Sequence, residues 1–384
     1  MKTIFMICCL VVFFSSCSKD KNVNDSASFE LQNTQELQEF YIWLISESES
    51  YYDNGTGHFG QESFGYRNVL NECYLRFDGY QLIQNTSIQN NQWIKVVLAD
   101  MSDYYKKIAN TIGTGAWGFP AETSHPEFGD GFEYEINAGN SINGWIYELS
   151  GDIGSKAGIY YVHGQVLSDI SKTYLRYRDN SLLEYIENGA RWIIDKNYDN
   201  GNVNYFAAAL KGLSYAYAAT NDEEIKLQAL SYLSAIIEAQ NNNGSFGETH
   251  DQEAGYHGIT LSCLAVAKKY LPKTELPSNF DISLSKATEY LRQLDDVEEE
   301  DRAAFVVQAW YYLSCLADDN LIPKLTNSDW NLYTEAINIC IQKKQELIRY
   351  KTENNYFYQK GIQTFSLIGS SVHKYSYSLK TEYY

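Results

Sequence analysis

Basic residues are scarce in this sequence relative to acidic ones. The chain has 30 Lys and Arg against 49 Asp and Glu, which gives a formal net charge of −19 at pH 7. A surface that binds nucleic acid needs a basic footprint to neutralise the phosphates, so the composition argues against a nucleic-acid partner. It also makes long acidic polysaccharides less natural ligands, although a local basic pocket can override the net charge.

The sequence patterns of several well-known chemistries are absent. We find no GxSxG, Walker, Rossmann or HExxH pattern, so serine-hydrolase, nucleotide-binding and standard metalloprotease chemistry have no support. The cysteines have neither zinc-finger nor CxxC spacing, and we expect no metal or other cofactor. Beyond the N-terminal region we expect buried free thiols rather than a disulfide framework, at Cys73, Cys263, Cys315 and Cys340.

The apolar stretch at the N-terminus is too short to span a bilayer stably. It runs over residues 4–14 after Lys2, as in an export signal. Ser15-Ser16-Cys17 then supplies the small residues and the cysteine of a lipoprotein-type cleavage site, although Phe14 stands where such sites usually carry Leu. A plain secretory signal with an incidental cysteine is the alternative. The polar stretch that follows favours lipidation at Cys17.

This pattern predicts three parts: a signal over residues 1–17, a flexible tether over 18–30 and one domain over 31–384. The segment Cys17-Ser18-Lys19-Asp20 resembles lipoproteins of Gram-negative glycan-degrading bacteria. The resemblance implies a protein that is exported and lipid-anchored to the outer membrane, and both its periplasmic face and the cell surface stay open.

Helical patterns of two kinds alternate along the domain. Some segments are amphipathic, and one of them, 221–240, begins with the capping-box signal of Asn221 followed by Glu224. Others are apolar nearly all round, which is typical of helices buried on all sides. The amphipathic segments are 181–196, 221–240 and 283–296, and the buried-type segments begin near residues 157, 204, 258 and 302.

The spacing of the buried-type segments is roughly 45 to 50 residues, which is in the range of a helical-hairpin repeat. An open solenoid would make both helix layers equally amphipathic, whereas a closed ring buries one layer completely. The alternation therefore predicts an all-α fold, an α/α toroid with inner and outer helices. Helical stretches near 33–50, 64–76 and 91–110 could supply further hairpins.

Two motifs connect this pattern to known families. QNNNGSFG, residues 240–247, resembles the repeats of terpenoid cyclase and protein prenyltransferase toroids, and the pairs His163-Gly164 and His257-Gly258 resemble lanthionine synthetase-like toroids. Many polysaccharide lyases and glycoside hydrolases share this kind of ring. The DxDD motif of the cyclases and the zinc ligands of the other two families have no counterpart, so the resemblance implies the fold more than any of those three activities.

The loop 240–258 is the first candidate site, because loops that lead into inner helices gather at one end of such a ring. Glu248, Asp251 and Glu253 could supply the two carboxylates that glycoside hydrolysis needs. A lyase would instead use Tyr256 or His257 to move a proton. The alternatives are that these acids only cap the following helix and that His257 is a hydrogen-bonded packing residue. Gly255 makes a zinc site of His250 and His257 improbable.

The connection 113–145 is the second candidate, because it is long and rich in Gly, aromatic residues and acids. Trp117 or Phe119 could form a sugar platform, and Glu122 or Asp130 could be a second carboxylate across the funnel. Calcium binding and simple packing are the alternatives.

Three residues at the starts of inner helices could also line the pocket. Asn204 and Tyr205 begin one helix, and Arg302 begins another. We favour a salt bridge between Arg302 and the acidic run 297–301 over a contact with substrate.

We therefore expect an exported lipoprotein that acts on a glycan, by hydrolysis or by lyase cleavage. The 33 tyrosines suit this role, because their rings can stack on sugars, although helix packing explains most of them. The alternatives are a glycan-binding lipoprotein without catalysis and a protein-interaction ring. The sequence does not decide whether the protein is an enzyme, and it leaves the oligomeric state open.

Overall fold

The computed structural model describes the chain in separate stretches between Thr34 and Val372, all within one unit, Leu31–Tyr384. They are residues 34–49, 52–53, 58–59, 119–120, 140–142, 145–148, 153–196, 202–299, 302–353, 358, 361–362, 364–369 and 371–372.

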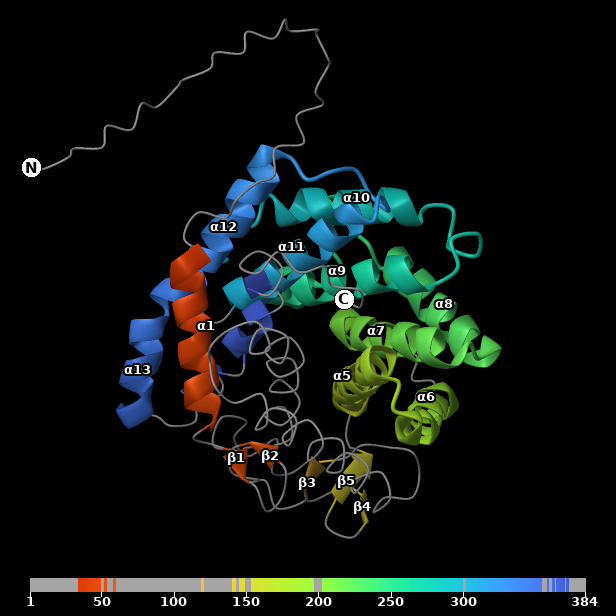
Figure 1. The fold of residues 1–384 in the computed structure, drawn as a ribbon. Coiled ribbons are helices and arrows are strands. Elements are labelled where there is room, and N and C mark those ends of the chain that lie inside the picture. The colour runs from red at the N-terminus through yellow and green to blue at the C-terminus, as the bar shows by residue number, and fades with distance from the viewer. Residues whose placement is uncertain are drawn as a thin grey trace, which may run out of the picture. The chain divides into compact units, whose positions relative to one another are not determined.

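Four helices lie side by side in chain order and form an inner row (Figure 1). Their side chains are buried around most of the circumference, as the apolar sequence predicted. One of them, α9, begins at Ala254 and so includes residues that the sequence analysis left in a loop. The inner helices are α5 (Ile153–Tyr177), α7 (Val203–Thr220), α9 (Ala254–Tyr270) and α11 (Arg302–Asp318).

An amphipathic helix follows each inner helix in the chain and packs against it on the outside of the row (Figure 1). The two layers therefore arise from consecutive helical hairpins. The outer helices are α6 (Leu183–Lys196, after the short 3-10 turn η2, Asn180–Leu182), α8 (Glu223–Glu238), α10 (Phe280–Leu291) and α12 (Asn327–Gln342).

Glycines let the inner helices approach one another closely. A Cβ on Gly212 of α7 would lie 2.6 Å from the carbonyl oxygen of Gly164 on α5, and a Cβ on Gly258 of α9 would lie 2.8 Å from the carbonyl oxygen of Phe305 on α11. Real Cβ atoms do not come this near to backbone oxygen. The inner row therefore depends on small residues at these crossings.

The helix at the beginning of the domain packs against helices at its end. This helix, α1 (Thr34–Glu49), contacts α12 and the 3-10 turn η4 (Ser366–Ile368). The ring of Phe40 lies edge-on to Phe365 at a centroid distance of 6.2 Å. Lys351 of α13 (Lys344–Glu353) donates to Glu47 at 2.6 Å. The two ends of the domain are thus neighbours, as a closed ring requires.

The QNNNGSFG loop is held by its first residue. The side-chain amide of Gln240 donates to the carbonyl oxygens of Gly244 (3.1 Å) and of Ser283 on α10 (2.9 Å). Gly244 has a φ of 96°, and a Cβ there would run into the backbone of Lys286. The motif is thus a brace that ties this loop to the outer helix α10.

The cap of α8 differs from the sequence prediction. Asn221 does not begin this helix: it ends α7 in a left-handed conformation with a φ of 56°, which Asn tolerates better than most residues. The next residue, Asp222, is the N-cap, and its carboxylate accepts from the amides of Glu224 and Ile225.

Short strands that the sequence analysis did not predict occur in the connections before α5. β1 (Tyr52–Asp53) and β2 (His58–Phe59) pair antiparallel. A second antiparallel sheet has the order β3-β5-β4, with β3 (Phe119–Pro120), β4 (Asn140–Ile142) and β5 (Trp145–Glu148). Its strand β5 lies against α5. The predicted helices near 64–76 and 91–110 lie outside the described residues.

The cysteines within the described stretches are buried free thiols, as predicted: Cys263, Cys315 and Cys340. Burial raises the pKa of the Cys263 thiol to about 12, although the nearby Lys211 acts in the opposite direction. Cys17 and Cys73 lie outside the described residues. None of the described helices combines the length and the hydropathy needed to cross a membrane.

Candidate active site

The beginnings of the inner helices meet at one end of the row. The rings of Tyr161 on α5 and Tyr205 on α7 contact each other at a centroid distance of 6.3 Å. A Cβ on Gly255 of α9 would lie 3.4 Å from the side chain of Arg302 on α11. We call this end the rim, and define it as residues 202–205, 247–256 and 296–299 together with Tyr161 and Arg302.

Asp251 is the most buried carboxylate of the rim, with 4% of its surface exposed. It lies in the 3-10 turn η3 (Thr249–Gln252) that precedes α9. Burial raises the pKa of Asp251, while the charge of His250 and backbone amides that include those of Val203 and Asn204 oppose the rise. Because these two amides belong to the first turn of α7, Asp251 caps the neighbouring inner helix.

One oxygen of this carboxyl group has no hydrogen-bond partner. Asp251 Oδ1 is buried and has no hydrogen-bond partner, and the same is true of Oδ1 of Asn204. Asn204 is 2% exposed, and Tyr205 beside it is half-buried. A buried polar atom without a partner is costly to stability, and such atoms are often kept at binding sites. The start of α7 therefore has two buried acceptors without partners next to an aromatic pair.

Arg302 is held by carboxylates at the rim. Its guanidinium lies 3.0 Å from Glu253 and 2.9 Å from Glu299, and it also pairs with Asp296. Burial works against its charge, but the three carboxylates together raise the pKa of Arg302. The salt bridge that the sequence favoured for Arg302 is thus present, and it extends to Glu253, which was a catalytic candidate.

Asp296 is a rim residue that the sequence analysis did not single out. Its Oδ2 accepts from the backbone amide of Ala254 at 3.1 Å, so it caps α9 as Asp251 caps α7. The connections after α8 and after α10 thus each supply a carboxylate to the inner helix of the preceding hairpin. The one sequence signal that could have identified Asp296 is an acidic residue shortly before a buried-type helix, and Asp251 has the same signal.

The other acid and the aromatic residues of this loop are more exposed. Glu248 is exposed, and its side chain does not cap η3. Tyr256 is half-buried, and its ring contacts that of His250 at a centroid distance of 3.9 Å. Among the residues that the structure describes, no group of three or more His, Cys, Asp or Glu could hold a metal ion.

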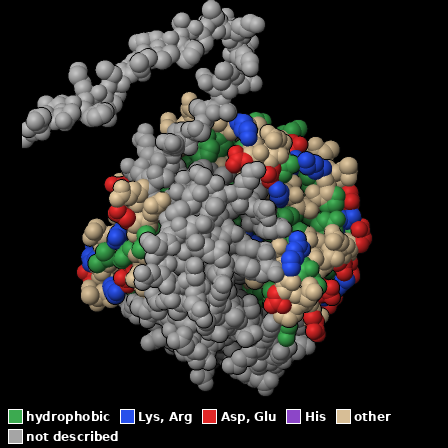
Figure 2. Space-filling view, viewed as in Figure 1, with side chains coloured by type: hydrophobic (Ala, Val, Ile, Leu, Met, Phe, Trp, Pro, Cys, Tyr) green, Lys and Arg blue, Asp and Glu red, His purple; other side chains and the backbone are tan. Residues whose placement is uncertain are grey.

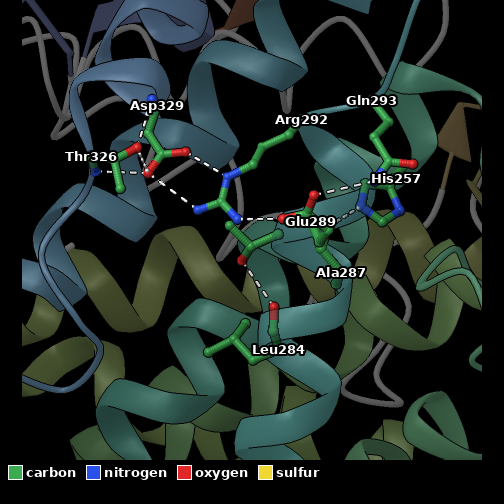
Figure 3. Close-up of polar contacts among 9 residues, drawn as sticks. His257, Leu284, Ala287, Glu289, Arg292, Gln293, Thr326 and Asp329 are labelled. Atoms are coloured by element: carbon green, nitrogen blue, oxygen red, sulfur yellow. Dashed lines mark hydrogen bonds and ion pairs between the residues drawn. The ribbon is translucent and has the colours of Figure 1, made fainter.

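His257 lies below the rim in the layer between inner and outer helices. It is fully buried, and its Nε2 donates to the carbonyl oxygen of Ala287 on α10 at 2.9 Å, as Figure 3 shows. Burial lowers the pKa of His257 to about 4, although the bond to Ala287 opposes this. His163 on α5 bonds to Gly189 of α6 in the same manner. Both histidines therefore have the packing role, and His257 is buried away from the rim.

A network of polar side chains lies near His257 on α10 and α12 (Figure 3). Arg292 pairs with Glu289 and with Asp329, which also accepts from Thr326 at the start of α12. Burial alone would raise the pKa of Asp329, but the bonds from Arg292 and Thr326 lower it. Asp329 is therefore a second buried capping carboxylate, in this case on an outer helix.

The second candidate site is described only in part. Phe119 lies in β3, where its backbone pairs with that of Ile146 in β5. Trp117, Glu122 and Asp130 lie outside the described residues. On the described part of the face shown in Figure 2, Lys and Arg side chains are interspersed with Asp and Glu.

No known protein family matches the sequence, and neither does any curated protein. Solved structures do match. A family 88 glycosyl hydrolase from Bacteroides vulgatus is similar with a TM-score of 0.53 at 10% identity, over 90% of this chain and 100% of that chain. An inactive variant of an α-1,6-mannanase from Salegentibacter, in complex with α-1,6-mannotetrose, has a TM-score of 0.54 at 12% identity, over 88% and 99%.

An unsaturated glucuronyl hydrolase from Streptococcus agalactiae is also similar, with a TM-score of 0.51 at 10% identity, over 88% of this chain and 93% of that chain. At such low identity these likenesses establish the fold alone. The fold is an α/α toroid, as the sequence predicted, and the structures that resemble it are those of enzymes that cleave carbohydrates.

Proposed function

We propose that this protein hydrolyses a glycosidic bond at the rim, with Asp251 as the proton donor. The fold of carbohydrate-cleaving enzymes supports the reaction class. The observation that carries the residue assignment is the state of Asp251, a buried carboxyl group with a raised pKa and one oxygen without a partner. A general acid needs a raised pKa and an oxygen whose proton can pass to the leaving oxygen.

The proposed reaction uses one water molecule. Asp251 gives its proton to the glycosidic oxygen as the bond from that oxygen to the anomeric carbon breaks. Water attacks the anomeric carbon and gives a proton to a second carboxylate. The proton on this second carboxylate then returns to Asp251 through solvent, so atoms and charges balance. The Oδ1 oxygen of Asp251 carries the transferred proton, since no protein group occupies it.

The second carboxylate is taken from the remaining sequence candidates. Glu253 is engaged by Arg302, whereas Glu248 is exposed, three residues before Asp251. We therefore place Glu248 first, ahead of Glu122 and Asp130. Direct attack by water inverts the anomeric carbon, and inverting hydrolases hold their two carboxylates about 6.5–9.5 Å apart, so the partner of Asp251 should lie at that distance.

The test incubates the full chain, in detergent, with a panel of polysaccharides while reducing ends and unsaturated products are followed together. We expect new reducing ends without unsaturated products. Asp251→Asn should lower the rate by roughly 100-fold or more, because it removes the acid but keeps a cap acceptor.

Asp329→Asn is the matched control, since it changes a buried capping carboxylate on the outer helix α12, which accepts from Thr326. It should cost stability and leave the rate unchanged. Equal rates for wild type and Asp251→Asn would contradict the assignment of Asp251.

Glycan binding without catalysis is the second candidate function. The observation that favours it is that Asp251 caps α7, which is a structural role that does not require catalysis. Retention on a glycan affinity gel without any cleavage would establish this alternative.

We also propose that the protein is exported and lipid-anchored through Cys17, on the outer membrane. The N-terminal sequence pattern supports this. A Cys17→Ser variant should lose metabolic labelling with a fatty acid and leave the membrane fraction, whereas labelling that persists would rule out Cys17 as the attachment site.

A further inference from the structure

The stretches of sequence directly before the inner helices contain no Lys or Arg. Lys and Arg are absent from residues 108–155 before and into α5, from 197–210 before and into α7, from 227–267 around the start of α9, and from 293–301 before α11. The same segments contain acids, among them Glu248, Asp251 and Glu253. These stretches therefore lack the Lys and Arg that would form a local basic pocket and override the negative net charge.

Arg302 is the one Lys or Arg at the rim as defined above, and it is already paired with carboxylates. Glu253, Asp296 and Glu299 surround its guanidinium, so the cluster carries one positive charge against three carboxylates. A carboxylate or sulfate on a bound sugar would have to displace one of these partners. The rim thus repels anionic groups rather than attracting them.

The rim does offer groups that suit an uncharged sugar. Asn204 Oδ1 and Asp251 Oδ1 are buried and without hydrogen-bond partners, and a sugar hydroxyl can donate to such acceptors. Tyr161 and Tyr205 are half-buried aromatic residues in contact with each other, and rings of this kind pack on the apolar faces of sugars.

We infer that the glycan bound at this rim is uncharged, with neither carboxylate nor sulfate on the sugars beside Asp251, and that it is cleaved by hydrolysis and not by β-elimination. This inference rests on the proposed function and narrows it to a substrate class. Elimination starts from a uronate whose carboxylate must be neutralised before the neighbouring carbon can lose its proton. The described residues of the rim include no Lys or Arg that is free to do so, because Arg302 is paired with three carboxylates.

The experiment compares matched pairs of polysaccharides. Each neutral glycan that the full chain cleaves or retains is oxidised at its primary hydroxyl groups, so that the same backbone then carries carboxylates. We expect binding and cleavage to fall at least tenfold after oxidation at low ionic strength. The loss should shrink as salt is added, because salt screens repulsion between like charges.

A variant pair tests whether the rim is responsible. Glu299→Gln removes an exposed carboxylate that pairs with Arg302 three residues later, and Glu289→Gln removes an exposed carboxylate that pairs with Arg292 in the same arrangement, on α10. The first should reduce the discrimination against the oxidised glycan several-fold. The second should leave it unchanged.

The outcomes separate the two proposals. Preference for the oxidised glycan, weakened by salt, would overturn the inference and leave hydrolysis standing. Unsaturated products from a uronate chain would overturn it as well. If no glycan of either kind is bound or cleaved, the proposed function fails, and the substrate class fails with it.

Discussion

At the scale of single residues, the burial of Asp251 has a direct consequence for pH dependence. Its pKa is raised in the folded state, so folding favours the protonated form. The stability that this gives is fully present below the unfolded pKa and is lost as the pH rises through the folded pKa. Asn resembles the protonated acid at every pH.

We therefore predict that Asp251→Asn melts close to wild type at pH 4 and at a higher temperature than wild type at pH 8. Thermal unfolding followed by circular dichroism at the two pH values measures this. A variant that melts lower than wild type at pH 8 would show that the ionised carboxylate stabilises the cap, contrary to the direction of its pKa.

His257 should make the protein sensitive to acid. Its pKa is lowered from 6.5 to about 4, so the folded state prefers the neutral ring. The resulting stability is present above pH 6.5 and is lost as the pH falls from 6.5 towards 4. At about 1.4 kcal/mol per pKa unit, the loss is about 3 kcal/mol, a large share of the roughly 5–15 kcal/mol that stabilises a typical protein.

The matching prediction is that His257→Gln is less stable than wild type at pH 7 but loses less on going to pH 4.5. Urea unfolding at both pH values measures the difference. His250→Gln, at an exposed position, is the control and should follow wild type.

At the scale of the elements, two glycines on α9 should respond differently to the same substitution. A Cβ at position 258 would lie 2.8 Å from the backbone oxygen of Phe305, whereas a Cβ at 255 would make ordinary contacts with side chains. Gly258→Ala should therefore force α9 and α11 apart and cost about 1–3 kcal/mol.

Gly255→Ala should be neutral or stabilising by up to about 1 kcal/mol, because Ala is the better helix former. Chemical denaturation of both variants measures the contrast. Equal effects at the two positions would mean that the inner helices can separate without cost.

The helices were predictable because burial and amphipathicity leave a periodic pattern, which identified α5 to α11 within a few residues.

The helix caps and the short strands were less predictable. Asn221 and Asp222 are adjacent, and both residue types are common at helix N-caps. Only the left-handed backbone of Asn221 shows that Asn221 ends α7 and that Asp222 is the N-cap of α8. The hydrogen bond from the amide of Ala254 to the carboxylate of Asp296 joins residues that are 42 apart in sequence, so no local sequence pattern predicts it. Strands of two to four residues such as β3 are too short to show alternation.

The candidate site was predictable in its location and less so in its roles. The sequence placed Asp251, Glu253 and Arg302 at the mouths of inner helices. It could not separate the buried Asp251 from Glu253, because burial and the partnership with Arg302 depend on neighbouring hairpins. His257 could not be assigned either, since its partner Ala287 belongs to another helix.

At the scale of the domain, the contacts between α1 and the C-terminal segment should stabilise the whole ring. Phe365 is buried against Phe40, and Tyr333 donates to Ser371 at 2.6 Å in the same region. Phe365→Ala should cost about 3–5 kcal/mol and should expose the amides of α1 to hydrogen exchange.

Ile348→Ala, at an exposed position on α13, should change neither quantity by a comparable amount. Hydrogen exchange with mass spectrometry resolves the effect by helix. Unchanged protection of α1 in the Phe365 variant would show that the N-terminal helix is held by other contacts.

The capping carboxylates also determine how this domain could be divided and recombined. Asp251 belongs to the connection after α8 but caps α7, and Asp296 belongs to the connection after α10 but caps α9. A transplanted helical pair that stopped at the end of its outer helix would leave its inner helix without an N-cap. The exchangeable module therefore runs from the first residue of an inner helix through the carboxylate of the following loop, so hairpins of this ring cannot be shuffled as helix pairs alone.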